Sequence, residues 1–282
     1  MKETLSNINN LKPINPEYEK NQQKLKFREK YNNREKMQFE YGEFEYIDIY
    51  PEKQTGQDIF VATGTPWSWD LMEDFIFSVQ NAGHRVMAIE HTGHMANNSD
   101  KYDPKIQRPA AINAFFEKKH LKNPIIIAHS MGFMDVARKG SDDISGIIAL
   151  NPAGLSKNSP LSHSLRSIKN IETALFPKSA EENESKYYKK LLKDFIKQSP
   201  SKSMKEIIDI GKTDIRDELK NFKNMPIITF RNTDDTIVPP SNSFNDNFRK
   251  LESGGNHLGP FIHEDQTQTV IKAIKEIEQK TK

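Results

Sequence analysis

One serine lies where a short apolar run meets small residues, in a pattern that nucleophilic catalysis requires. Residues 125–128 are Ile-Ile-Ile-Ala and residues 129–132 are His-Ser-Met-Gly. A strand that runs into a sharp turn before a helix exposes a serine Oγ above its sheet, and the strained turn accepts only small residues two positions before and after the serine. The backbone N–H of Met131 would then point to where an oxyanion forms. We therefore predict that Ser130 is a nucleophile, the alternative being a serine that only caps a helix.

Four further segments accompany this turn along the chain. They are residues 63–68 (Thr-Gly-Thr-Pro-Trp-Ser), 90–94 (Glu-His-Thr-Gly-His), 235–239 (Asp-Thr-Ile-Val-Pro) and 254–257 (Gly-Gly-Asn-His). In that order, they resemble the oxyanion loop, a turn after the next strand, the acid segment and the histidine segment of the α/β-hydrolases. Residues 128–132 resemble the nucleophile elbow of the same family. The resemblance extends from about Phe39 to the end of the chain.

The resemblance implies a catalytic triad of Ser130, Asp235 and His257, in the chain order that this fold uses. His257 would take the proton from Ser130 Oγ and return it to the leaving group, while Asp235 fixes the tautomer of the imidazole. The backbone N–H groups of Met131 and Thr65 would form the oxyanion hole.

The chain departs from the family's pattern at a few positions. Ala128 replaces a glycine of the elbow, Thr63 replaces a histidine of the oxyanion loop, and Glu90 replaces an aspartate. The oxyanion loop can still stabilise an oxyanion with a threonine at position 63, because its donor is a backbone N–H. Two acids adjoin in the acid segment, and the spacing to the following valine and proline favours Asp235, which leaves Asp234 to bond backbone N–H groups of the turn.

Other histidines have competing interpretations. His129 adjoins the serine, but we expect its ring to lie against the sheet and not to act as the base. Glu90, His91 and His94 could form half of a metal site, yet no third histidine or acidic cluster completes it, so we expect no metal ion. Phosphate-binding glycine loops are absent from the sequence, and we expect no cofactor.

Apolar patterns indicate the elements that would position these residues. Short apolar runs alternate with segments of helical spacing, which predicts the α/β class: a mostly parallel twisted sheet with helices on both faces. The expected strands are residues 59–62, 86–89, 125–128, 147–150 and 226–230, with a hairpin around Gly42 and a weak last strand at residues 251–253. With the resemblance, this predicts an α/β-hydrolase fold.

Two segments are expected to lie outside this core. Residues 1–36 are rich in Asn, Lys and Glu, and we expect a loosely attached arm with a helix that starts at Pro16. In residues 156–222 the strand signal disappears and apolar residues recur at helical spacing. We expect a helical cap there, inserted into a core formed by residues 37–155 and 223–282.

Composition limits the possible function classes. Lys and Arg number 41 against 39 for Asp and Glu, a net charge of +2, so bulk charge does not favour nucleic-acid binding. The absence of cysteine excludes disulfides and thiolate chemistry. No apolar run approaches the ~20 residues of a membrane span, and the first residues are polar. We expect a cytoplasmic protein without stable membrane insertion.

These observations predict a serine hydrolase that cleaves carboxylic ester-type bonds through an acyl-enzyme. Its expected partner is a small-molecule acyl substrate. Trp67, Phe133, Leu155 and Phe261 are expected to line the acyl pocket, although core packing explains the tryptophan equally well. Two alternatives remain: C–C, amide or acyl-transfer chemistry on the same triad, and a non-catalytic ligand-binding protein on the same fold.

Overall fold

The computed structural model describes residues 16–65, 69–90, 102–155, 200–235, 238 and 248–281. The chain divides into two compact units, with the boundary between Arg34 and Glu35. The first unit contains α1 (Pro16–Asn32), which begins at the proline expected to start a helix. Its Phe27 and Tyr31 rings lie with their centroids 5.2 Å apart. The second unit begins with the first strand, so two residues expected in the arm belong to the sheet.

An eight-stranded sheet forms the centre of the second unit, in the order β1-β2-β4-β3-β5-β6-β7-β8. The strands are β1 (Glu35–Phe39), β2 (Gly42–Ile49), β3 (Ile59–Ala62), β4 (Val86–Ile89), β5 (Ile125–His129), β6 (Gly146–Leu150), β7 (Ile227–Asn232) and β8 (Arg249–Ser253). β1 and β2 form an antiparallel hairpin and β2 also runs antiparallel to β4, whereas the remaining pairs are parallel. The predicted hairpin and the mostly parallel sheet are confirmed.

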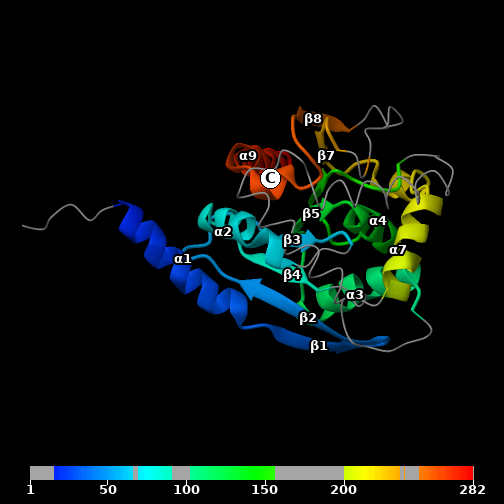
Figure 1. Cartoon of the computed structure of the whole chain (residues 1–282), viewed down its shortest axis with the longest axis horizontal. Coiled ribbons are helices and arrows are strands. Elements are labelled where there is room, and N and C mark those ends of the chain that lie inside the picture. Colours follow the sequence, from blue (N-terminus) through cyan, green and yellow to red (C-terminus); the bar gives the residue numbers. More distant parts are fainter. Residues whose placement is uncertain are drawn as a thin grey trace, which may run out of the picture. The chain divides into compact units, whose positions relative to one another are not determined.

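Helices cover both faces of this sheet (Figure 1). α2 (Glu73–Asn81) and α9 (Glu264–Lys280) lie on one face, and α3 (Pro104–Lys119) and α4 (Met131–Lys139) lie on the other. The other described helices of this unit are η1 (Trp69–Met72), α7 (Pro200–Lys212), η2 (Glu218–Phe222) and α8 (Gly259–Ile262). Across the described ranges, no helix has the length and apolar character needed to cross a bilayer.

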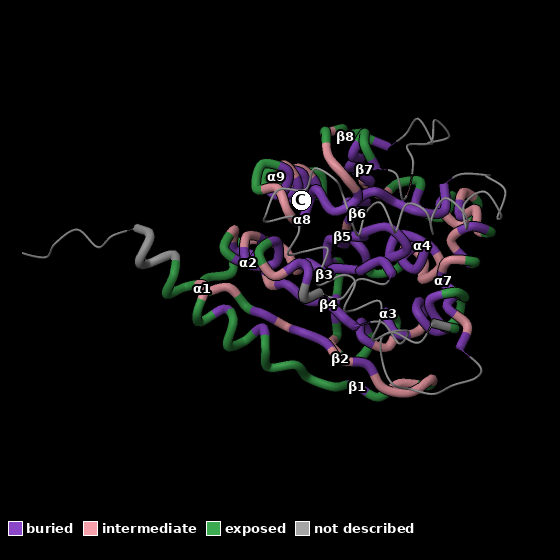
Figure 2. Tube along the Cα trace, viewed as in Figure 1, coloured by how far each residue is buried: buried purple, intermediate pink, exposed green. Residues whose placement is uncertain are grey.

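Burial differs between the centre and the edges of the sheet (Figure 2). Every residue of β3, β4, β5, β6 and β7 is buried, whereas β1 and β8 at the two edges are largely exposed or half-buried. Parallel strands covered on both faces have apolar side chains at every position and not only at alternate ones. This explains why the central strands appear in the sequence as continuous apolar runs and β8 does not.

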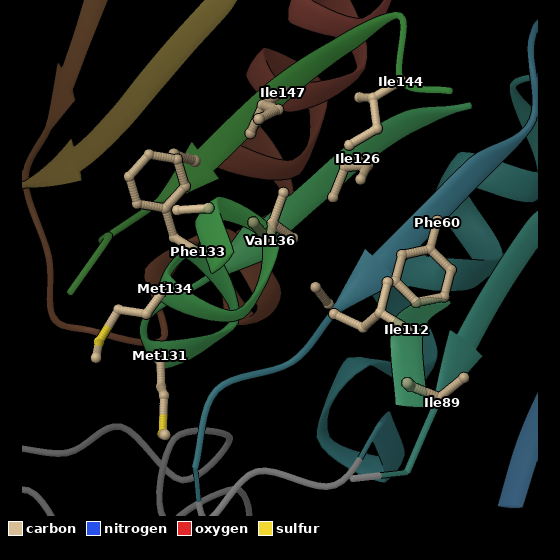
Figure 3. Packing of buried hydrophobic residues seen from close by; sticks show 14 of the residues in the cluster. Phe60, Ile89, Ile112, Ile126, Met131, Phe133, Met134, Val136, Ile144 and Ile147 are labelled. Atoms are coloured by element: carbon tan, nitrogen blue, oxygen red, sulfur yellow. The ribbon is translucent and has the colours of Figure 1, made fainter. Parts of the chain in front are cut away.

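The core holds α4 firmly against the sheet. Phe133 and Val136 of α4 face the strands that carry Ile126 and Ile147, and Ile112 of α3 packs in the same cluster (Figure 3). Burying each such side chain stabilises the fold by roughly 1.5–3 kcal/mol. Rigid packing of α4 also fixes the turn that enters it from β5.

Of the predicted insertion at residues 156–222, the structure describes residues 200–222. They form α7 and η2, and α7 packs on α3. Residues 156–199 lie outside the described residues, so the cap remains a prediction for that segment.

Candidate active site

Ser130 occupies a strained turn between β5 and α4. Its φ is 52° and its ψ is −121°, a backbone conformation that residues other than glycine rarely adopt. Three main-chain hydrogen bonds hold it: its N–H donates to the Leu150 carbonyl (3.0 Å), and its carbonyl accepts from the N–H groups of Phe133 (3.2 Å) and Ala153 (3.1 Å). Strain of this kind persists only where the surroundings enforce it, and it clusters at active sites.

Gly132 allows the end of β3 to lie directly against the start of α4. A Cβ on Gly132 would lie 2.3 Å from the carbonyl oxygen of Ala62 and 3.0 Å from that of Thr63. No side chain fits between these backbones, which is the physical reason for a small residue at this position. The close approach places the loop after β3 beside Met131, the first residue of α4.

His257 and Asp235 form a buried pair. Nδ1 of His257 lies 2.6 Å from Oδ2 of Asp235, whose Oδ1 accepts the N–H of Val238 at 2.9 Å. Only 3% of His257 and 4% of Asp235 is exposed, so water screens the pair little. Asp234 is exposed and accepts the N–H of Gly255 at 3.0 Å. The structure thus places Asp235, and not Asp234, against the imidazole.

The main chain of His257 is tied to the residue that precedes Ser130. Its carbonyl oxygen lies 3.1 Å from Nε2 of His129 and accepts Nδ2–H of Asn151 at 3.0 Å, and the two imidazole centroids are 4.6 Å apart. Oδ1 of Asn151 accepts the N–H of Asn232 at 2.8 Å. The sequence reasoning missed these two asparagines. Their signal was available, because a buried amide at or just after the end of an apolar strand needs a hydrogen-bonding partner.

The surroundings of His129 favour the neutral form of its ring. Burial, together with the nearby His257, holds the pKa of the His129 imidazole well below its ordinary value. Since a carbonyl oxygen can only accept, the contact with His257 requires the ring proton on Nε2 of His129. His129 therefore acts as a buried donor to the main chain and lies in the sheet layer, where it was expected.

We expect His129 to make the folded protein less stable in mild acid. Because folding lowers its pKa, the unfolded chain binds more protons than the folded one. The free energy of unfolding should therefore fall as the pH drops below about 6.5, by at most ~1.4 kcal/mol per pH unit. His129→Gln keeps an N–H donor but does not titrate. Urea denaturation at pH 7 and pH 5 should show a smaller loss in this variant, and an equal loss would contradict the assignment.

The predicted pocket residues occupy two different environments. Phe133 and Leu155 belong to the hydrophobic core cluster. Phe261 lies at the site: its ring meets that of His129 edge-on with centroids 4.9 Å apart, and Phe75 packs against it at 5.2 Å. The role of Phe133, Leu155 and Phe261 in lining a substrate pocket remains a prediction.

Several predicted site residues lie outside the described residues. They are Trp67, which was expected in the acyl pocket, and His91 and His94, which were considered as part of a metal site. Glu90 is described and donates its N–H to the Glu45 carbonyl at 2.8 Å. Among described side chains there is no group of His, Asp and Glu that could hold a metal ion.

Sequence comparison finds no matching family model and no significantly similar curated protein. Structural comparison finds solved structures that match most of this chain and nearly the whole of their own length. An enol-lactonase from Burkholderia xenovorans has a TM-score of 0.71 at 13% identity, covering 86% of this chain and 99% of that one. An esterase from Exiguobacterium antarcticum has a TM-score of 0.69 at 15% identity, with coverages of 85% and 98%. A bromoperoxidase from Bacillus anthracis has a TM-score of 0.66 at 17% identity, with coverages of 86% and 100%. The chain has the α/β-hydrolase fold, as its motifs implied.

Proposed function

We propose that this chain is a serine hydrolase that cleaves carboxylic ester-type bonds through an acyl-enzyme at Ser130. One observation carries the proposal. The ring of His257 bonds to Asp235, while the carbonyl of His257 bonds to His129, the residue next to Ser130. An imidazole, the carboxylate bonded to it and a serine in a strained turn thus share one end of the sheet, which supports the roles of base, orienting acid and nucleophile.

The proposed mechanism assigns each of these groups a role. Asp235 accepts Nδ1–H of His257, which leaves the lone pair on Nε2 to take the proton of Ser130 Oγ as that oxygen attacks the substrate carbonyl. The backbone N–H groups of Met131 and Thr65 would stabilise the oxyanion. His257 then protonates the leaving alcohol and activates a water molecule, which releases the acid.

The substrate we propose is a small molecule with a small or medium apolar acyl group. Phe261 beside the histidines supports an apolar pocket. In this proposal Trp67, Phe133 and Leu155 extend the pocket, and residues 156–222 form a cap that sets the accepted chain length. An esterase and an enol-lactonase occur among the structures of the same fold, which agrees with ester-type chemistry.

Labelling with a fluorophosphonate probe tests this function directly. The full chain should become labelled on the peptide that contains Ser130, and Ser130→Ala should not. A panel of esters, thioesters and amides of graded chain length should show turnover of esters first. Faster turnover of amides would favour the alternative chemistry on the same triad. A chain that neither reacts with the probe nor turns over any substrate, yet binds one, would be a ligand-binding protein.

A further inference from the structure

A fully buried arginine links three helices to the loop that follows β3. Arg108 of α3 donates from Nε to Oδ2 of Asp135 on α4 at 2.8 Å, and from Nη1 to Oε1 of Glu206 on α7 at 3.1 Å. Its Nη2 donates to the carbonyl oxygen of Thr63 at 2.9 Å. Arg108, Asp135 and Glu206 are each 0% exposed. The rigid guanidinium fork serves all three partners at once, which a lysine could not do.

Glu206 holds the same loop at a second point. Its Oε2 accepts a hydrogen bond from Oγ1 of Thr65, and its Oε1 accepts one from the hydroxyl of Tyr102 as well as the bond from Arg108. Arg108 therefore holds the loop by the carbonyl of Thr63, and Glu206 holds it two residues later by the side chain of Thr65. Residues 63–65 of the loop are therefore held at both ends.

Stabilisation of the fold does not by itself explain why these charged residues are buried together. Burying charged groups carries a large desolvation cost, and apolar residues of the same volume often stabilise a core as well or better. Burial raises the pKa of Asp135 to about 6, in spite of the opposing effect of Arg108 beside it. Moreover, Arg138 of α4 already pairs with Asp209 of α7 at 2.6 Å, so the buried network is not needed to join these two helices.

We propose that Arg108, Asp135 and Glu206 are positioning residues that hold the backbone N–H of Thr65 where an oxyanion forms. This inference rests on the proposed serine-hydrolase function. The close approach at Gly132 brings the loop against the start of α4, so the donors of Thr65 and Met131 keep a fixed spacing only while the loop stays in place. A misplacement of about 1 Å in a catalytic group can cost ~10²-fold in rate.

Glu206→Gln tests the proposal. The amide has one acceptor oxygen in place of two, so it cannot accept from Thr65, Tyr102 and Arg108 together. We expect kcat for a reactive ester to fall by ~10²-fold with little change in KM, because oxyanion donors act in the transition state. Hydrogen exchange, followed by mass spectrometry on a peptide that spans residues 59–65, should become faster.

Asp209→Asn is the matched control, since it also changes a buried acid of α7 to its amide and breaks an ion pair to α4. Among the described residues the Asp209 carboxylate pairs with Arg138, Thr213 and Lys105 and not with the loop, so this variant should lower stability yet keep kcat and the loop exchange of the wild type. Thr65→Val provides a milder test if Glu206→Gln does not fold. It removes the hydroxyl and keeps the backbone N–H, and kcat should fall by roughly 10-fold, as loss of positioning predicts. Thr65→Ser keeps the hydroxyl and should restore the rate.

Two results would overturn the proposal. One is a wild-type kcat in both Glu206→Gln and Thr65→Val. The other is loop exchange in Glu206→Gln that equals that of Asp209→Asn. Exchange does not require turnover, so it separates this inference from the proposed function. If the wild type hydrolyses nothing, the function is rejected, and the exchange comparison alone decides whether the network holds the loop.

Discussion

Ser130→Ala should fold as the wild type does and lose at least ~10³-fold in kcat, because it removes the nucleophile of the proposed mechanism. Folding should survive, since main-chain atoms make the bonds that hold this turn: the N–H of Ser130 donates to the Leu150 carbonyl, and its carbonyl accepts from the N–H groups of Phe133 and Ala153. Alanine keeps these atoms and also lacks the bulk that the turn excludes. The remaining activity would come from water attack assisted by the oxyanion donors and substrate binding.

Ser145→Ala is the control for this variant. Ser145 precedes the first residue of β6, at the opposite end of that strand from the candidate site, and its Oγ donates to the Asn123 carbonyl at 2.6 Å. It should keep the wild-type kcat and the fluorophosphonate labelling. Initial rates on a reactive ester, with thermal unfolding of both variants, complete the comparison. Retention of most of the activity by Ser130→Ala would show that another group is the nucleophile.

The sheet was predictable because its central strands are buried on both faces. β5 and β6 are apolar at nearly every position and buried throughout, so their runs are plain in the sequence. β8 is an edge strand with the sequence Arg-Lys-Leu-Glu-Ser and only partial burial, and its apolar signal is correspondingly weak. Its place in the sheet comes from parallel pairing with β7, which sequence periodicity does not record.

The candidate site was predictable only where its residues are close in sequence. Ser130 has a local signature, the strand followed by small residues around a tight turn. The pairing of Arg108 with Glu206 joins residues 98 positions apart, and each reads in the sequence as an ordinary charge on a helix. Phe133 shows another limit: it lies close to the serine in sequence and shares a helix face with Val136, and both are buried in the core cluster. Sequence position alone does not distinguish a core residue from one that also lines a pocket.

The second large effect is expected at Asp235. In Asp235→Asn the N–H of Val238 still needs an acceptor, which draws the amide oxygen to the place of Oδ1. The amide nitrogen then faces Nδ1 of His257, where Oδ2 now lies at 2.6 Å. An N–H at this position donates to Nδ1 and places the imidazole proton on Nε2, the atom that must accept the proton of Ser130. The variant should therefore lose up to ~10⁴-fold in kcat, the magnitude known for the equivalent change in a serine protease.

Asp234→Asn is the matched control, because the same change is made one residue away. Asp234 is exposed, and its carboxylate accepts the backbone N–H of Gly255. An amide oxygen can accept that bond equally well, so kcat should stay close to the wild type and stability should change by no more than ~1 kcal/mol, the typical net contribution of one hydrogen bond. Both variants should be measured at a pH where the wild type is fully active and the chemical step limits the rate. The reverse order of effects, with Asp234→Asn inactive and Asp235→Asn active, would mean that His257 is oriented by Asp234 in the working enzyme and that the contact at 2.6 Å is only structural.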